Sequence, residues 1–206
     1  MNKKKYYIII LCGLLISLQV VFGRITQINL VIVRINLIFI PIALGGAILG
    51  PLWNGVICVA ADIVNFALFP QGMFFPGFTL SAMLTGLIYG FFLKTPLPSL
   101  NKFGKTGANT GQSPLSNTKI LIIRTFMAAF CVTILIEQCL NTYWITLLPE
   151  MNEAYDYYFA VRLPKSLVML PLHVVLVAAI WRSIGKYIES TVIPKIASAR
   201  ENISGS

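Results

Sequence analysis

The chain has 206 residues, of which 57% are hydrophobic and only 11% are charged. Soluble domains carry about 25% charged residues, so this chain has too little charge to cover a surface in water. The composition also excludes a disordered chain, a collagen-like repeat and a disulfide-rich secreted scaffold. At about 20 residues per crossing, the length accommodates six or seven transmembrane helices and no sizeable soluble domain. We therefore expect an all-α integral membrane protein.

Apolar segments predict six transmembrane helices in a single domain over residues 1–190. Residues 94–118 are rich in Pro, Gly, Asn, Ser and Lys and predict a basic cytoplasmic loop. Residues 191–206 predict a cytoplasmic tail. The predicted spans are approximately 6–22, 36–50, 52–69, 74–93, 119–147 and 160–188.

The positions of Lys and Arg predict the orientation, because cytoplasmic loops carry an excess of these residues. With the N-terminus in the cytoplasm, 12 of the 16 basic residues lie inside, and six spans return the C-terminus to the same side. The net charge of +9 is then a topology signal rather than a sign of nucleic-acid binding. Residues 23–35 join the first two spans and are expected to lie extended over the outer end. Four basic residues are predicted outside: Arg24, Arg34, Arg162 and Lys165.

Ionisable residues inside a span are costly and are usually functional or paired. Asp62 is about 15 Å along the third span, which is near the membrane midplane. Asn65 and Phe66 follow at i+3 and i+4 and share its face. Two interpretations stay open here: Asp62 binds a ligand, or it is a structural partner of Arg34 or Lys165.

The last two spans carry further polar groups toward the outer side. Glu137 and Trp144 are predicted to share one face of the fifth span, and Arg162 and Lys165 share a face of the sixth. Glu137 either contributes to a ligand site or pairs with Arg162. His173 lies deeper and is expected to form a hydrogen bond between helices.

These groups, together with Phe75, Phe78 and Thr79, predict an outward-facing pocket. Aromatic side chains stack on flat rings, while Asp and Asn pair with the N–H and carbonyl edges of a heterocycle. Arg and Lys bind carboxylates. The pattern therefore suits a heteroaromatic ring with a carboxylate tail. An interfacial aromatic belt is the alternative explanation for the aromatic residues.

Gly13 and Ser17 place two small residues on one face of the first span, which permits close approach of another helix. Packing inside the chain is the alternative explanation. The sequence contains no phosphate-binding loop and no zinc-protease or serine-hydrolase motif. The four cysteines form no C-x-x-C pair. We therefore expect no catalytic site, no cofactor and no metal.

Several stretches resemble the substrate-binding S components of energy-coupling factor (ECF) vitamin transporters, and in particular their folate-specific branch. The resemblance covers about residues 8 to 190. Its most specific parts are FPGFTLSA at residues 75–82 and RLPK at 162–165. Similar stretches occur at residues 34–41, 50–55, 61–63, 74–82 and 158–165.

The resemblance implies a multi-pass protein of the bacterial plasma membrane that binds folate on the outer side. It implies a transmembrane coupling protein and two cytoplasmic ATPases as partners, so that ATP is hydrolysed outside this chain, which is not itself an enzyme. Members of the family are thought to topple in the membrane to release the vitamin. Their first helix presents an A-x-x-x-A face to the coupling protein, and here Gly13 and Ser17 stand at the matching positions. The expected substrate-binding residues are Arg34, Asp62, Asn65, Phe66, Phe75, Phe78, Thr79, Trp144, Arg162 and Lys165.

Other functions make different predictions. An S component for another vitamin would bind a different heterocycle. A small membrane transferase or protease would show turnover without an ATPase partner. A stand-alone channel or secondary carrier would catalyse uptake in liposomes that contain this chain alone.

Overall fold

A computed structural model of the chain describes residues 3–26, 28–29, 34–35, 37–70, 74–94, 118–148, 154–192 and 195. The predicted loop 94–118 and tail 191–206 lie mostly outside the described residues. Helices account for nearly all of the described part, with one pair of two-residue strands. In chain order the elements are α1 (Lys3–Ile25), β1 (Ile28–Asn29), β2 (Arg34–Ile35), α2 (Phe39–Leu49), α3 (Pro51–Leu68), α4 (Pro76–Leu93), α5 (Thr118–Phe130), the π-helix η1 (Cys131–Leu140), α6 (Asn141–Thr146), α7 (Tyr155–Tyr187) and the π-helix η2 (Ile188–Val192).

The protein is an all-helical membrane protein. Within the described ranges, five helical stretches are long and apolar enough to cross a bilayer. One of them, Lys119–Thr146, runs without a break through α5, η1 and α6. The five stretches are Tyr6–Ile25, Pro51–Leu68, Pro76–Leu93, Lys119–Thr146 and Tyr155–Ser183.

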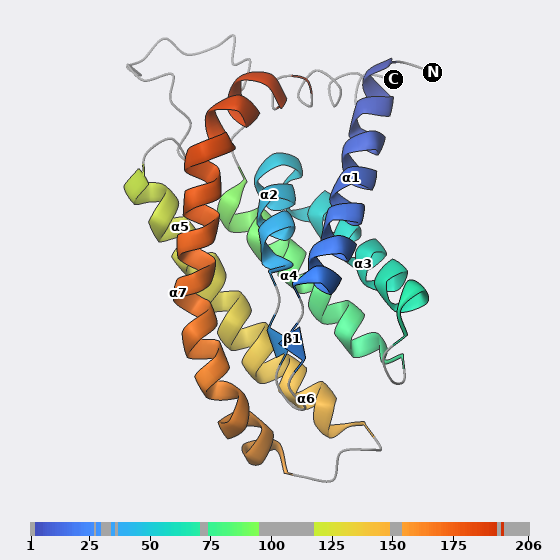
Figure 1. Cartoon of the computed structure of the whole chain (residues 1–206), viewed down its shortest axis with the longest axis vertical. Coiled ribbons are helices and arrows are strands. Elements are labelled where there is room, and N and C mark those ends of the chain that lie inside the picture. Colours follow the sequence, from blue (N-terminus) through green and yellow to red (C-terminus); the bar gives the residue numbers. More distant parts are fainter. Residues whose placement is uncertain are drawn as a thin grey trace.

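Helix α2 is the sixth apolar helix and is shorter than the span that the sequence predicts over residues 36–50. It has 11 residues, so it is only about 16 Å long, whereas the hydrocarbon core is about 30 Å thick. Nine of its residues are buried, and it contacts α1, α3, α4 and α7. Figure 1 shows α2 in the middle of the bundle. A helix that is apolar on every side belongs in a core, so α2 acts as the central packing element.

A tight turn at Gly50 joins α2 to α3. Gly50 has a φ of 79°, a conformation that side-chain-bearing residues rarely adopt. Pro51 follows at the first position of α3, where its missing N–H is no loss. The turn therefore reverses the chain within one residue and sets α3 against α2.

Asn54 fastens three helices together at the centre of the bundle. Its fully buried amide nitrogen donates to the carbonyl oxygen of Ile42 on α2 at 3.1 Å and to that of Gly86 on α4 at 2.8 Å. Because buried amides are costly unless they are hydrogen-bonded, this pair of bonds fixes the rotation of α3 against its neighbours. The orientation of Asp62, two turns further along α3, follows from this fixed rotation.

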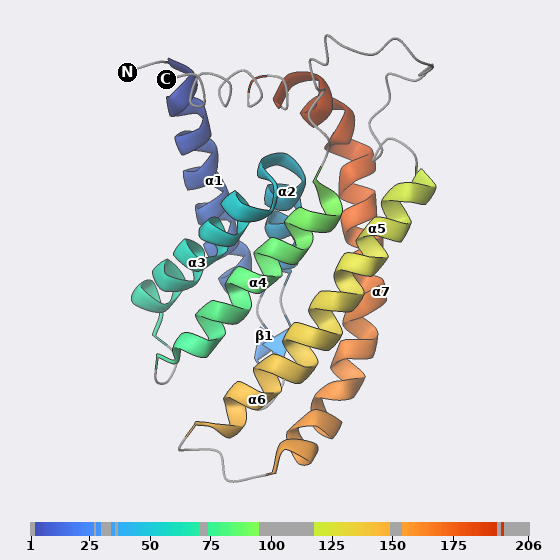
Figure 2. The same cartoon turned by 180° about the vertical axis from the view of Figure 1, so that it is seen from behind.

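The two ends of the bundle differ. Helix α1 begins and α7 ends at the same end, as Figures 1 and 2 show, and the Lys195 ammonium lies 5.8 Å from the centre of the Tyr7 ring. The opposite end carries the β1–β2 pair, α6 and the start of α7. The sequence predicts the first end to be cytoplasmic and the second to be external, and this orientation stays a prediction.

The segment between α1 and α2 is only partly extended. The sequence predicts an extended course for all of residues 23–35, but α1 continues to Ile25. Beyond it, Ile28 pairs with Ile35 and Asn29 with Arg34 in an antiparallel hairpin. The helix continues through Gly23 and Arg24 and so extends past the predicted end of the span.

Candidate ligand-binding site

Aromatic side chains gather in a group at the start of α4, where they contact Phe66 of α3 and Trp144 of α6. The Phe75 ring is 5.9 Å from that of Phe78 and 5.7 Å from that of Trp144, and Phe66 is 5.0 Å from Phe74. The indole N–H of Trp144 donates to Ser81 Oγ at 3.1 Å and so holds α6 against α4. The structure thus brings together most of the aromatic residues that the sequence assigns to the ligand.

Gly77 makes this aromatic packing possible. A Cβ at this position would lie 2.5 Å from the Phe75 ring and 2.6 Å from the Trp144 ring. Both distances are far below a van der Waals contact, so any larger residue must push one ring aside. The glycine of the FPGF stretch therefore has a packing role at the first turn of α4.

Asp62 and Thr79 form one polar contact beside the aromatic group. The Thr79 hydroxyl donates to Asp62 Oδ2 at 2.7 Å, which links α3 to α4. Across the described part of the chain, the only salt bridge is that between Lys165 and Glu137, so Lys165 is not the partner of Asp62. The side chain of Arg34 lies outside the described residues, which leaves its proposed pairing with Asp62 a prediction. A carboxylate that accepts a single hydroxyl proton retains acceptor capacity for the N–H groups of a ligand.

Asn65 has a partner that the sequence analysis did not identify. Arg24, at the end of α1, donates to Asn65 Oδ1 at 2.9 Å and to the carbonyl oxygens of Asn65 at 3.4 Å and Phe69 at 2.5 Å. Its guanidinium also lies 4.5 Å from the centre of the Phe69 ring. A cation at the last carbonyls of a helix complements the helix dipole. The sequence signal was present: Arg24 is a lone cation at the end of an apolar span.

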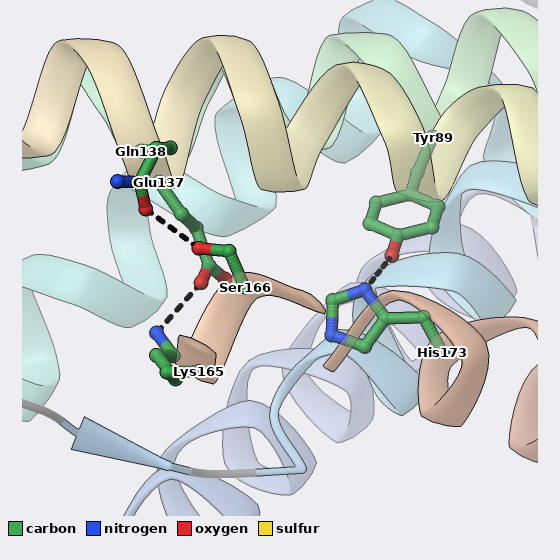
Figure 3. A network of polar contacts seen from close by, with 6 residues as sticks. All are labelled: Tyr89, Glu137, Gln138, Lys165, Ser166 and His173. Carbon is green, nitrogen blue, oxygen red and sulfur yellow. Dashed lines mark hydrogen bonds and ion pairs between the residues drawn. The ribbon is translucent and has the colours of Figure 1, made fainter. Parts of the chain in front are cut away.

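A seam of polar contacts joins η1 to α7 (Figure 3). Lys165 Nζ lies 2.7 Å from Glu137 Oε2. Next to this pair, the Ser166 hydroxyl donates to Gln138 Oε1 at 2.7 Å, and Gln138 Nε2 donates to the carbonyl oxygen of Phe159 at 2.6 Å. The sequence left two alternatives for Glu137, a role in a ligand site or an ion pair with Arg162. The structure contains an ion pair, but the partner of Glu137 is Lys165 and not Arg162.

The backbone is irregular on both sides of this seam. Glu137 and Gln138 lie in a ten-residue π-helix. This conformation is rare in proteins as a whole, but where it occurs it is often at a functional site. The facing helix α7 contains Pro164 and Pro171. Pro164 has no N–H for the Ala160 carbonyl and distorts the preceding turn, which also contains Phe159. Arg162 is 8% exposed and lies one turn before Ser166.

His173 bridges two helices deeper in the bundle. Its Nδ1 is 3.2 Å from the Tyr89 hydroxyl, and its ring centre is 3.8 Å from that of Phe39 on α2. This contact between α7 and α4 is the kind of helix-to-helix hydrogen bond that the sequence suggests for His173.

The face of α1 around Gly13 is open. Nothing within 4 Å would meet a Cβ at Gly13, and the Ser17 hydroxyl is bonded to the Gly13 carbonyl at 2.9 Å. Ile10 and Leu14 beside them are exposed. Packing inside the chain, the alternative explanation for these small residues, is therefore not what the structure contains.

A separate apolar cavity lies between α2, α4, α5 and α7. Its walls include Ile40, Leu93, Leu121 and Trp181. It offers no cation or carboxylate. The chemistry that suits a carboxylate-bearing heterocycle is instead gathered around α3, α4, η1 and the first half of α7.

A family model described as "ECF transporter, substrate-specific component" matches residues 8–181. The chain belongs to this family. The match confirms the resemblance to ECF S components that the FPGFTLSA and RLPK stretches indicate. As a substrate-specific component of ECF transporters, the chain is a multi-pass protein of the bacterial plasma membrane and a transport subunit.

Similar proteins cover most of this ECF component. The folate transporter FolT of Clostridium novyi (strain NT) is 31% identical over 183 residues, which are 89% of this chain and 92% of the relative. The folate transporter FolT of Leuconostoc mesenteroides subsp. mesenteroides is 25% identical over 170 residues, 80% of this chain and 79% of the relative. A crystal structure of FolT bound with folic acid has 32% identity and a TM-score of 0.68, and the match covers 88% of this chain and 95% of that one.

Proposed function

We propose that this ECF component binds folate at the outer face of the membrane and releases it inside when it is coupled to an ATPase module. The observation that carries the proposal is the match to FolT bound with folic acid, at 32% identity and a TM-score of 0.68 over 88% of the chain. The two curated relatives named folate transporter support the same substrate.

The chemistry of the candidate site supports this substrate. The pterin ring of folate is flat, and the rings of Phe75, Phe78 and Trp144 provide faces on which it can stack. The remaining acceptor capacity of Asp62 suits the N–H edge of a pterin. The tail of folate carries carboxylates, for which Arg162 and Lys165 are suitable partners. Asn65, Phe66, Thr79 and Arg34 complete the proposed set.

We further propose that the partners are a transmembrane coupling protein and two ATPases, which perform the ATP hydrolysis. The open face at Gly13 and Ser17 is the surface proposed to contact the coupling protein. Small residues permit two helix backbones to approach closely, and glycine and serine are small enough to replace the alanines of the family pattern.

Tryptophan fluorescence provides the test of substrate identity. Trp144 lies in the aromatic group, whereas Trp53 is exposed on α3 and Trp181 lines the separate apolar cavity. A Trp53→Phe/Trp181→Phe variant therefore leaves Trp144 as the only tryptophan and as a reporter at the site. We expect a saturable change with folate and none with riboflavin, thiamine or biotin. A saturable change with another vitamin alone would contradict the folate assignment.

A further inference from the structure

Lys165 already has an anionic partner inside the protein. Its ammonium lies 2.7 Å from the Glu137 carboxylate, and the two side chains are 10% and 24% exposed. The neighbouring contact between Gln138 and Ser166 links the next residue of η1 to the next residue of α7. Two successive residues on each helix are thus bonded in parallel, which holds the carboxylate in register with the ammonium (Figure 3).

An unpaired ammonium group at this depth is costly, so Lys165 needs a counter-ion whenever no ligand is bound. Glu137 supplies one. A ligand carboxylate offers the same two oxygens and the same charge, and it therefore competes with Glu137 for the same ammonium. The pair is partly exposed, so it is not sealed inside the protein.

The displaced Glu137 carboxylate would still have a cation near it. The charge of Arg162 also acts on Glu137. Gln138 remains bonded to the Phe159 carbonyl and to Ser166, so η1 and α7 stay joined when the ion pair opens. The exchange of one carboxylate for another is therefore compatible with the packing of the two helices.

We propose that Glu137 is an internal counter-ion that occupies Lys165 in the unliganded protein and is displaced by a carboxylate of the ligand. Glu137 is in this sense a positioning and specificity residue that acts through Lys165. A neutral ligand cannot replace the Glu137 carboxylate, so the pair selects for ligands with an anionic tail. This inference rests on the proposed folate-binding function and adds a residue that sets how tightly the tail is held.

The test compares folate with its neutral dimethyl ester on the wild-type chain and on Glu137→Gln. Removal of the competing charge should tighten folate binding by about tenfold, while the affinity for the ester stays unchanged. Glu137→Asp keeps the charge but shortens the side chain and weakens the pair, so we expect a smaller gain of about two- to threefold. This second variant provides the answer if the glutamine variant is too unstable to purify.

Asp156→Asn is the matched control for net charge. It removes one exposed carboxylate from the first turn of α7, and Asp156 forms no salt bridge with Lys165. A selective gain for folate should therefore appear with Glu137→Gln and not with Asp156→Asn. The gain should also disappear when Glu137→Gln is combined with Lys165→Met.

The outcomes separate the two proposals. If the wild-type chain fails to bind folate, the proposed function is wrong and the inference falls with it. If the wild-type chain binds folate but Glu137→Gln and Glu137→Asp both bind it more weakly, Glu137 orients Lys165 instead of competing with the ligand. Equal changes for folate and its ester would mean that the ion pair only holds the helices together, and either result would overturn the inference.

Discussion

The Arg24 guanidinium donates to the Asn65 amide oxygen at 2.9 Å and so joins α1 to α3. Arg24 and Asn65 are 41 positions apart in the sequence. The same guanidinium reaches the Phe69 carbonyl at the end of α3. Arg24 therefore links the C-terminal end of α1 to the end of α3, which precedes the aromatic group. The contact also uses one polar atom of Asn65, a residue that the sequence alone assigns to the ligand.

Replacement of Arg24 by Met should destabilise the protein, because the final carbonyls of α3 lose a charged donor. Charged hydrogen bonds contribute about 1.5–3 kcal/mol when buried, and partial exposure reduces this to about 1 kcal/mol. Thermal unfolding in detergent should show a lower Tm for Arg24→Met than for Arg24→Lys, which retains the charge. Equal Tm values for wild type and Arg24→Met would contradict the capping role.

Thr79→Val should weaken folate binding while leaving the shape of the site intact. The valine is nearly isosteric with threonine but cannot donate to Asp62, so the carboxylate loses its fixed orientation. We expect a loss of about tenfold or more in affinity, in line with about 1.5–3 kcal/mol for a hydrogen bond to a charged group. Thr79→Ser keeps the hydroxyl and is the control. If titration gives valine and serine variants the same affinity, the hydrogen bond has no role in binding.

Gly77→Ala should disturb the aromatic group. The added methyl would come within 2.6 Å of both the Phe75 and the Trp144 rings, so at least one ring must move. We expect weaker folate binding and a shifted Trp144 emission in the single-tryptophan background. Gly13→Ala is the matched control, because a methyl there meets nothing within 4 Å. Unchanged emission and affinity in Gly77→Ala would show that the packing of the rings is unimportant.

Larger residues at Gly13 and Ser17 should separate binding from transport. Leucine at both positions fits the open face of α1 but prevents close approach of a second helix. Folate affinity of the purified chain should be unchanged, whereas ATP-dependent folate uptake by the assembled transporter should be lost. Normal uptake by the Gly13→Leu/Ser17→Leu variant would place the contact with the coupling protein elsewhere.

Hydropathy predicted the helical membrane fold well, because apolar length alone identifies a spanning helix. It could not identify α2 as a short helix, since a buried helix in a bundle and a membrane-crossing helix have the same apolar composition. The two differ in length, and α2 begins at Phe39 without a side-chain cap that the sequence could reveal. The paired strands before it have two residues each, which is too short to leave a period in the sequence.

The grouping of the aromatic residues is easier to predict from the sequence than the partners of the charged residues. Phe75, Phe78 and Trp144 were grouped from their residue types, and the structure packs Phe75 against both. The partner of Glu137 could not be fixed, because a partner depends on the rotation of each helix. The α-helical period used for residues 137–144 does not hold within the π-helix Cys131–Leu140, which contains an extra residue per turn.

The most direct test of the central claim is equilibrium dialysis of labelled folate against the purified chain, with the Arg162→Ala/Lys165→Ala variant measured alongside. We predict saturable binding of one folate per wild-type chain, no competition from riboflavin, thiamine or biotin, and a large loss of affinity in the double variant. Wild-type affinity in the double variant would contradict the assignment of the carboxylate-binding residues. The absence of folate binding by folded wild-type protein would contradict the proposed function itself.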